Sequence, residues 1–359
     1  MRPKIPQLDA IRGAAIALVI MHNTSNKYPS LHLQALFSNG WMGVDLFFVL
    51  SGLLITGILV DTKGSESYLR NFYARRCLRI WPLYYSLIVF MFVAVPLLRP
   101  ADARVVFERS SPWWAYPLFL QNFLIPTPTM ATGPLAVTWS LAIEEQFYLV
   151  WPLVVRCCSD AQLRRIAIAV IGLSPVLRLY LSSHHVEIYA TVFCRLDGLM
   201  AGALLALALR SADFLPSRFI KRAWICLLTA APLAFLTEAF DARWIAFSFT
   251  AVASASCVYL ALFSPNKWLQ TVLTNKALVY TGTISYGLYL IHKIPLDVAQ
   301  ALHVDHHPLL LLPISLLAGY AMAALSWNLL EKPFLDLKRF FESSGVADQR
   351  RTSPVWMRS

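Results

Sequence analysis

Ionisable side chains lie inside the hydrophobic stretches of this chain. The run from Gly43 to Ile55 contains Asp45 and Ser51. Three arginines stand just before the next hydrophobic run: Arg75, Arg76 and Arg79. Ionisable groups at membrane depth are costly and usually mark a function, and arginines clustered at a membrane edge suit phosphate groups. The combination of ionisable groups inside hydrophobic stretches with an arginine cluster at the membrane edge therefore indicates a membrane enzyme that uses a phosphorylated donor.

Arg12 and His22 share the first hydrophobic segment. An arginine near one helix end could bind a phosphate or a carboxylate, and a histidine about 15 Å further along could act as a general base on a hydroxyl. The alternative is that Arg12 extends to the lipid headgroups while His22 bonds a neighbouring helix. The pair alone leaves both readings open.

Two adjacent carboxylates, Glu144 and Glu145, lie in the fourth hydrophobic segment. Neighbouring helical residues point about 100° apart, so we expect the two to face different partners. One could pair with an arginine while the other orients or deprotonates a histidine. The alternative is that both neutralise buried arginines, which is a structural role.

Further polar groups are expected at one depth in the outer half of the helices. They are Asp45, Glu144, Glu145, Arg195, Asp197, His22 and His292. The arginine cluster is expected at the opposite, cytoplasmic face. No CxxC pair and no Cys/His spacing typical of a metal site is found among the six cysteines and eight histidines, so neither disulfides nor zinc are predicted.

The elements that must position these residues are helices. The chain has 359 residues, 57% of them hydrophobic and 14% charged, whereas a soluble domain carries roughly a quarter charged residues. Hydropathy predicts an all-α, polytopic transmembrane bundle of about ten spanning helices, at residues 6–25, 40–60, 80–98, 134–155, 165–182, 192–210, 222–239, 244–263, 277–297 and 309–330. Residues 1–340 are predicted to form one integral membrane domain, and 341–359 a polar, disordered cytoplasmic tail.

The net charge is +11, and the distribution of the positive residues along the chain indicates the membrane topology. Lysines and arginines concentrate in alternate loops, which places both termini in the cytoplasm and gives no support for nucleic-acid binding. The first segment contains charged residues and has no small-residue cleavage site, so it is predicted to be a retained helix and not a signal peptide. The short, proline-rich stretch from Trp113 to Ile125 is expected to be an external interfacial or re-entrant piece.

Several motifs, in order and spacing, extend over nearly the whole chain. They are Leu8 to Gly13 leading to His22, Gly43 to Ile55, Phe72 to Tyr85, Trp139 to Pro152, Arg195 to Gly198, Gly282 to His292, and Trp327 with Glu331 to Phe334. Together they resemble the membrane acyltransferase-3 family, which includes O-acetyltransferases that modify O-antigens, exopolysaccharides and Nod factors.

The resemblance implies transfer of an acyl group, commonly acetyl, from cytoplasmic acyl-coenzyme A (acetyl-CoA) to a hydroxyl of a cell-envelope or exported glycan or glycolipid. It implies a multi-pass protein of a bacterial inner membrane. Within the family, the positions of Arg12 and His22 are the key pair, and the arginines before the third helix are functional.

These roles and the residue patterns give three groups of site residues. The predicted catalytic residues are His22, Glu144, Glu145 and Asp45. The predicted donor-binding residues are Arg12, Arg75, Arg76 and Arg79. The predicted acceptor-binding residues are Arg195, Asp197, His292 and Ser51; no metal is expected.

The spacing of Arg12 and His22 departs from the family. In the family, the histidine returns to nearly the same helix face as the arginine. Here the two are ten positions apart, which is about 80° out of phase on an ideal helix. Either the helix is kinked or bulged, or the two residues serve different parts of one pocket.

The main alternative function is a proton-coupled secondary transporter, in which the buried carboxylates and histidines form a proton relay. The sequence shows neither an inverted repeat nor a matched pair of broken helices, and a cluster of arginines at one face is more typical of donor binding. A purely structural scaffold would leave the many buried charges unexplained. The acceptor could be a lipopolysaccharide, an exopolysaccharide, a glycolipid or a small antibiotic-like molecule.

Overall fold

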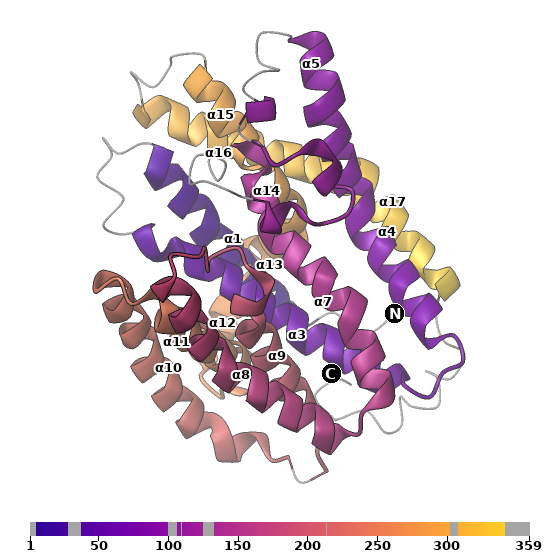
Figure 1. The fold of residues 1–359 in the computed structure, drawn as a ribbon, viewed down its shortest axis with the longest axis vertical. Coiled ribbons are helices and arrows are strands. Elements are labelled where there is room, and N and C mark those ends of the chain that lie inside the picture. Colours follow the sequence, from indigo (N-terminus) through magenta and orange to yellow (C-terminus); the bar gives the residue numbers. More distant parts are fainter. Residues whose placement is uncertain are drawn as a thin grey trace.

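The fold is all-helical. A computed structural model describes residues 5–27, 37–99, 106–108, 110–124, 133–212, 214–301 and 308–341. The predicted tail from 342 onwards lies outside the described residues. Nine longer helices build the described part: α1 (Pro6–Lys27), α3 (Gly43–Thr62), α4 (Tyr68–Val89), α7 (Thr138–Cys157), α8 (Asp160–Ser183), α9 (Leu196–Ala208), α10 (Pro216–Ala239), α11 (Arg243–Phe263) and α16 (Pro308–Ser326) (Figure 1).

Shorter helical pieces connect these. They are α5 (Val95–Leu98), α12 (Lys267–Leu273), α13 (Lys276–Thr283), α14 (Ser285–Ile291), α15 (Lys293–Ala301) and α17 (Lys332–Asp336), with 3₁₀ turns that include η2 (Ser38–Met42), η7 (Pro134–Val137) and η11 (Leu337–Phe341). Residues 110–124 form only short 3₁₀ turns, η4 (Trp113–Ala115) and η5 (Gln121–Phe123). This stretch therefore contains no spanning helix, as predicted.

Six helical segments are long and apolar enough to cross a membrane. Among the described residues they are 38–62, 68–98, 160–183, 216–239, 243–263 and 313–341. The chain is thus a polytopic helical membrane protein. The larger number of about ten spans stays a prediction, because α1 and α7 carry the charged residues discussed above and α9 is short.

Three predicted helix starts come too late in the chain, and one of them is that of α10, which begins at Pro216 and not at residue 222. Helix α4 begins at Tyr68, not near residue 80, so the three arginines lie inside the helix and not in a loop before it. Helix α8 begins at Asp160 because Ser159 and Gln162 form a capping box, which satisfies backbone donors of the first turn. Hydropathy missed these three starts because the first turns contain polar residues.

The segment predicted as one helix over 277–297 is broken into α13, α14 and α15. Pro295 explains the second break, at His292, because a proline cannot donate to the carbonyl four residues earlier and its ring clashes with that carbonyl. The last helix instead passes Pro333 through a π turn, Trp327–Glu331, and continues to Phe341. The prediction that it ends at 330 is therefore wrong.

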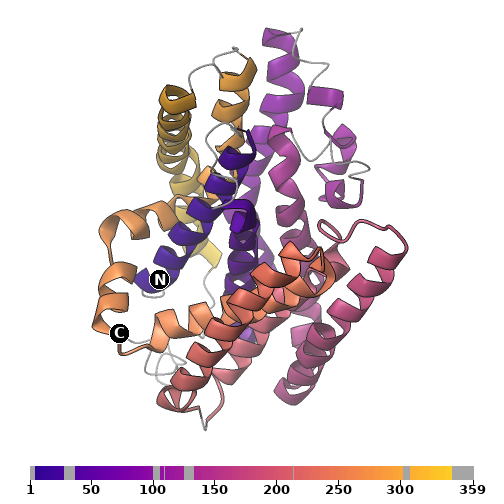
Figure 2. The ribbon, with the colours of Figure 1, turned by 90° about the vertical axis from the view of Figure 1, so that its left-hand side faces the viewer.

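Helices α1 and α3 lie between two groups of helices. In Figures 1 and 2, α8, α10 and α11 lie together on one side, while α4, α16 and α17 lie on the other. Helix α1 packs on α13 at Gly282, where an added Cβ would lie 1.7 Å from the carbonyl oxygen of Asp9. This arrangement brings α1, α3, α4, α7 and α14 together around the site described below.

Helices α3 and α9 approach each other closely at glycines. A Cβ added to Gly202 would lie 2.0 Å from the carbonyl oxygen of Val49. We therefore expect Gly202→Ala to destabilise the protein by about 1–3 kcal/mol, because the backbone of α3 must move. Thermal unfolding in detergent measures this. Gly64→Ala is the control, since nothing lies within 4 Å of its added Cβ; equal unfolding midpoints for the two variants would contradict the close packing.

Candidate active site

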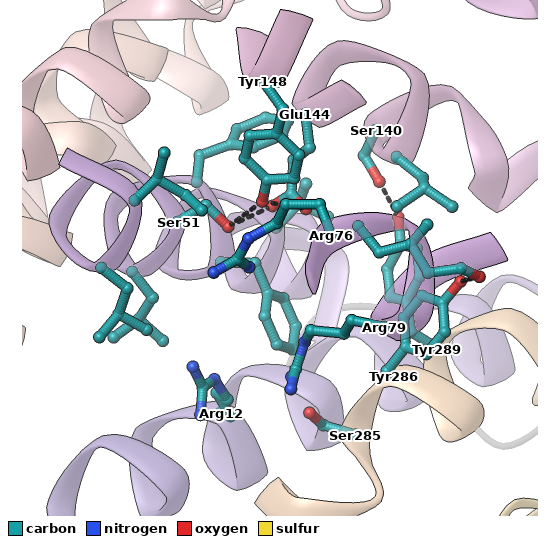
Figure 3. Close-up of a pocket in the computed structure, with 18 residues that line it drawn as sticks. Arg12, Ser51, Arg76, Arg79, Ser140, Glu144, Tyr148, Ser285, Tyr286 and Tyr289 are labelled. Carbon is teal, nitrogen blue, oxygen red and sulfur yellow. Dashed lines mark hydrogen bonds between the residues drawn. The ribbon is translucent and has the colours of Figure 1, made fainter. Parts of the chain in front are cut away.

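A cavity of about 110 Å³ lies where α1, α3, α4, α7 and α14 meet. Its polar lining comes from all five helices, and Figure 3 shows these side chains pointing toward a common space. They are Arg12, Ser51, Arg76, Arg79, Ser140, Glu144, Tyr148, Ser285, Tyr286 and Tyr289. The rest of the lining is apolar, so these groups act in a largely dehydrated space where charge interactions are strong.

Three arginines give the cavity a positive character. Arg76 and Arg79 lie one turn apart on α4, which places them on the same face, and Arg12 approaches from α1 (Figure 3). Arg12 donates to Asp9 at 2.5 Å. Arg76 lies 5.7 Å from the ring centroid of Tyr148, and its buried Nε has no hydrogen-bond partner among the described residues. A buried donor without an acceptor is costly, so this cavity favours an anion.

Opposite Arg76, a carboxylate is held by two hydroxyls. Ser51 donates to Glu144 at 2.6 Å, and Tyr148 donates to the second carboxylate oxygen at 3.2 Å. The Tyr148 hydroxyl also lies 3.2 Å from Ser51 Oγ (Figure 3). Tyr148 follows Glu144 by one turn of α7, so the helix itself places them together. The structure thus brings the predicted Glu144 and Ser51 next to the predicted donor-binding arginines.

Helix α14 closes another wall of the cavity with tyrosines. The Tyr289 hydroxyl lies 2.6 Å from Ser140 Oγ and donates to the Val137 carbonyl at 3.0 Å. Tyr286 donates to the Ile80 carbonyl of α4 at 2.7 Å. These bonds fix α14 against α7 and α4. Sequence analysis did not single out these tyrosines, although both belong to the Gly282-to-His292 motif.

His22 lies at the far end of α1 from Arg12 and is not among the described residues that line the cavity. Its Nδ1 lies 3.1 Å from the Phe37 carbonyl. A carbonyl only accepts, so Nδ1 carries the proton and Nε2 holds the lone pair of the neutral ring. The Phe37 carbonyl thus has the orienting role at Nδ1 that sequence analysis gives to Glu144 or Glu145.

His292 is buried beside α1, close to His22. Its Nδ1 lies 2.9 Å from the Tyr289 carbonyl, so the same reasoning places its proton on Nδ1. Its Nε2 lies 3.2 Å from Nδ2 of Asn23, the residue after His22, and so accepts a hydrogen bond there. Tyr289, one turn earlier, lines the cavity. In α1, the cavity residue Arg12 precedes His22 in the chain. In the same way, the cavity residue Tyr289 of α14 precedes His292, which follows the last residue of that helix.

Arg12 and His22, ten positions apart, lie at different levels of one continuous helix. Helix α1 is an uninterrupted α-helix from Pro6 to Lys27. The helix therefore contains no π bulge and no break between the two residues. Arg12 faces the cavity, while His22 belongs to the level of Phe37 and His292.

Asp45, Arg195 and Asp197 lie in a separate, buried ion-pair cluster. Arg195 donates to Asp45 at 2.8 Å, and Arg178 of α8 donates to Asp197 at 2.8 Å. Ser248 of α11 donates to Asp197 at 3.0 Å. The cluster joins α3, α8, α9 and α11 and does not border the cavity. Arg178 was missed by the sequence analysis, although an arginine inside the apolar stretch 165–182 is itself a signal.

Aromatic rings surround the guanidinium of Arg195. The rings within 5.8 Å of it are those of Trp41, Phe48, Trp139, Tyr189 and Phe247. Burial raises the pKa of Tyr189, which follows α8 in a loop, to about 12, so its phenol is neutral at physiological pH. Cation–π contacts of this kind stabilise a buried arginine.

Replacement of Asp197 by alanine is expected to impair folding. Asp197→Ala leaves Arg178 buried without its counter-charge, which costs about 3–5 kcal/mol. We expect the variant to accumulate poorly in membranes and to unfold at lower temperature, whereas Asp160→Ala at the exposed start of α8 should behave as the wild type. Normal stability with lost activity would instead place Asp197 in substrate binding.

The two remaining predicted residues lie at the edge of this arrangement. Arg75 is half-buried on α4 next to Arg76 and does not line the cavity. Glu145 has a buried Oε1 without a hydrogen-bond partner in the described part of the chain, and its charge acts on Arg76. The described residues contain no group of three or more His, Cys, Asp or Glu side chains that could hold a metal ion.

The chain is similar in sequence to an acyltransferase family and to known and putative O-acetyltransferases. A family profile described as "Acyltransferase domain" matches residues 5–329. "Peptidoglycan O-acetyltransferase OatA" of Listeria monocytogenes is 29% identical over 92% of this chain and 56% of its own length. "Putative peptidoglycan O-acetyltransferase YrhL" of Bacillus subtilis is 30% identical over 92% of this chain and 54% of its own. "Putative O-acetyltransferase SACOL0978" of Staphylococcus aureus is 25% identical, over 92% and 57%.

The chain therefore spans about half the length of the curated relatives it matches. No solved structure shows a significant match to this chain.

Proposed function

We propose that this chain, which belongs to the acyltransferase-3 family of membrane proteins, transfers an acetyl group from acetyl-CoA to a hydroxyl of a cell-envelope glycan. The observation that carries the proposal is the cavity in which Arg12, Arg76 and Arg79 converge beside Glu144. Such a site suits an anionic donor, because arginine binds phosphate groups with several donors at once.

The donor's phosphates are proposed to bind at the arginines, from the cytoplasmic side. The nucleotide is proposed to stay at the mouth of the cavity while the pantetheine arm extends inward past its mostly apolar wall. The arm then follows α1 and α14, which lead from the cavity to His22 and His292. Glu144, held by Ser51 and Tyr148, shapes the cavity and balances part of its positive charge.

His22 is proposed to be the general base. Its Nε2 takes the proton of the acceptor hydroxyl as that oxygen attacks the thioester carbonyl carbon. The new C–O bond forms, the C–S bond breaks, and the proton passes from His22 to the leaving thiolate. The products are an acetyl ester and the free thiol.

The acceptor is proposed to be a glycan on the outer side of the membrane, with peptidoglycan as the first candidate. This rests on the names of the relatives from Listeria monocytogenes and Bacillus subtilis. The buried Asp45–Arg195 and Asp197–Arg178 pairs are proposed to hold the helices that frame the acceptor's approach.

The function can be tested with the purified protein in vesicles. Acetyl-CoA labelled in its acetyl group is supplied with peptidoglycan fragments, and acetylated product is identified by mass spectrometry. The proposal expects a 42-Da increment per acetyl group on the fragments, as exchange of H for C₂H₃O requires, together with release of free coenzyme A. Solute flux without consumption of acetyl-CoA would favour the transporter alternative and contradict the proposal.

A further inference from the structure

Arg76 is held by aromatic rings and not by a carboxylate. Its guanidinium carbon lies 5.8 Å from the ring centroid of Phe72, one turn earlier on α4, and 5.7 Å from that of Tyr148 on α7. The two rings meet edge to face, with their centroids 6.5 Å apart. Among the described residues Arg76 forms no ion pair, and its buried Nε has no hydrogen-bond partner. Cation–π contacts hold an arginine without neutralising its charge, so Arg76 stays available to an anion in the cavity.

A carboxylate that lines the same cavity is held by other groups. Both oxygens of Glu144 accept hydrogen bonds from hydroxyls, Oε1 from Ser51 at 2.6 Å and Oε2 from Tyr148 at 3.2 Å. Figure 3 shows Arg76 beside the hydrogen bonds that link these three side chains. An ionised carboxylate can only accept. The two hydroxyls therefore satisfy Glu144 where it lies, and they reduce its tendency to turn toward the guanidinium.

An ion pair between Glu144 and Arg76 would compete with an anionic donor. A guanidinium that is paired with a carboxylate has fewer N–H groups left for a phosphate. The donor would have to break that pair in a largely apolar cavity, where charge interactions are strong. Tyr148 contacts both side chains: its ring lies beside Arg76, and its hydroxyl donates to Glu144.

We propose that Tyr148, together with Ser51, is a positioning residue that keeps Glu144 from pairing with Arg76 and so leaves this arginine free for a phosphate group of the acyl donor. This role rests on the proposed function. It gives the donor site a preformed arginine whose charge is not cancelled before the donor arrives. It also gives Glu144 a role that differs from the direct pairing with an arginine expected from the sequence.

Kinetics of variants that release Glu144 test this role. Tyr148→Phe keeps the ring beside Arg76 and removes only the hydroxyl, so Glu144 can turn toward the guanidinium. We expect the KM for acetyl-CoA to rise roughly 5- to 20-fold with kcat unchanged, because hydrogen bonds to charged groups are strong. Ser51→Ala should act in the same direction. Glu144→Gln in the Tyr148→Phe background should return the KM to the wild-type value, since a neutral amide cannot form the competing ion pair.

Tyr73→Phe is the matched control. The Tyr73 hydroxyl of α4 donates to the Leu149 carbonyl of α7 at 2.9 Å, and Tyr73 is not among the described residues that line the cavity. This variant therefore also loses a tyrosine hydroxyl that bonds α7, but it leaves the hydroxyls on Glu144 in place. Its KM for acetyl-CoA should equal that of the wild type.

Three results would overturn the inference: an unchanged KM in Tyr148→Phe, a raised KM that Glu144→Gln does not lower, or an equal rise in Tyr73→Phe. The second would place the Tyr148 hydroxyl on the donor itself, and the third would make the effect a loss of helix packing. If Tyr148→Phe fails to fold, Ser51→Ala with and without Glu144→Gln gives the same comparison. Each of these results leaves acetyl transfer by the wild type intact. A wild type that does not use acetyl-CoA would instead refute the proposed function, and the inference with it.

Discussion

Replacement of His22 by alanine is expected to lower acetyl transfer by roughly 10²–10⁴-fold, the usual contribution of a positioned general base. The physical reason is the tautomer. The Phe37 carbonyl fixes the proton on Nδ1, which makes Nε2 the basic nitrogen of the ring and the proposed acceptor of the hydroxyl proton. The KM for acetyl-CoA should change little, because the proposed binding site of the donor's phosphates lies at the other end of α1. Initial rates at saturating acceptor measure this effect.

His22→Asn is the matched variant, because an asparagine side chain can still donate to the Phe37 carbonyl but cannot act as a base. It should be as inactive as the alanine variant while unfolding at the wild-type temperature. His184→Ala, at an exposed position after α8, should keep full activity. Activity of His22→Ala within a few-fold of wild type would refute the assignment of the base.

Replacement of Arg79 by alanine should act on the donor. Arg79 lines the cavity together with Arg12 and Arg76, so its loss removes one of the three cations there. Hydrogen bonds to charged groups contribute about 1.5–3 kcal/mol, which corresponds to a rise of roughly 10- to 100-fold in the KM for acetyl-CoA. The KM for the glycan acceptor should stay near its wild-type value. Steady-state kinetics with each substrate varied in turn would measure the KM for acetyl-CoA and the KM for the glycan acceptor separately.

Arg165→Ala is the control for this loss of charge, because Arg165 is an exposed arginine on α8, away from the cavity. It should leave both KM values unchanged. If Arg79→Ala weakens use of the acceptor and spares the donor, the arginines belong to a different part of the mechanism.

Much of the helical architecture follows from hydropathy, and the differences arise where polar residues or prolines decide the structure. Helix α4 continues over its arginines because the first turns pack on other helices and need no apolar sequence. Helix α14 is separated from α15 because of Pro295, whereas Pro333 is accommodated by a π turn. Hydropathy averages over a window and cannot distinguish these two responses to proline.

The predicted site residues separate into groups that a sequence cannot assign. Arg12, Ser51, Arg76, Arg79 and Glu144 meet at one cavity. Their distances along the chain say nothing of this meeting, which depends on how five helices pack. The tyrosines of the cavity were missed because a tyrosine in an apolar segment is usually an ordinary packing residue.

The pairing of Asp45, Arg195 and Asp197 could not be predicted for a related reason, and their proposed roles stay predictions. A buried charge in a membrane segment indicates a function by default, yet Asp45 is paired with Arg195, just before α9, and Asp197 with Arg178 of α8. Only the three-dimensional structure reveals such a match. A structural role is one explanation of these pairs, whereas Arg76 and Arg79 of α4 form no ion pair within 4 Å among the described residues and line the cavity.

The central claim is that the donor binds at the arginine cavity while the chemistry takes place at His22. Equilibrium binding of a non-reactive acetyl-CoA analogue to the wild type, His22→Ala and Arg79→Ala tests it most directly. We predict that His22→Ala binds the analogue with wild-type affinity although it no longer transfers acetyl groups, and that Arg79→Ala binds it roughly 10- to 100-fold more weakly. Wild-type affinity in Arg79→Ala, or loss of binding in His22→Ala, would contradict the claim.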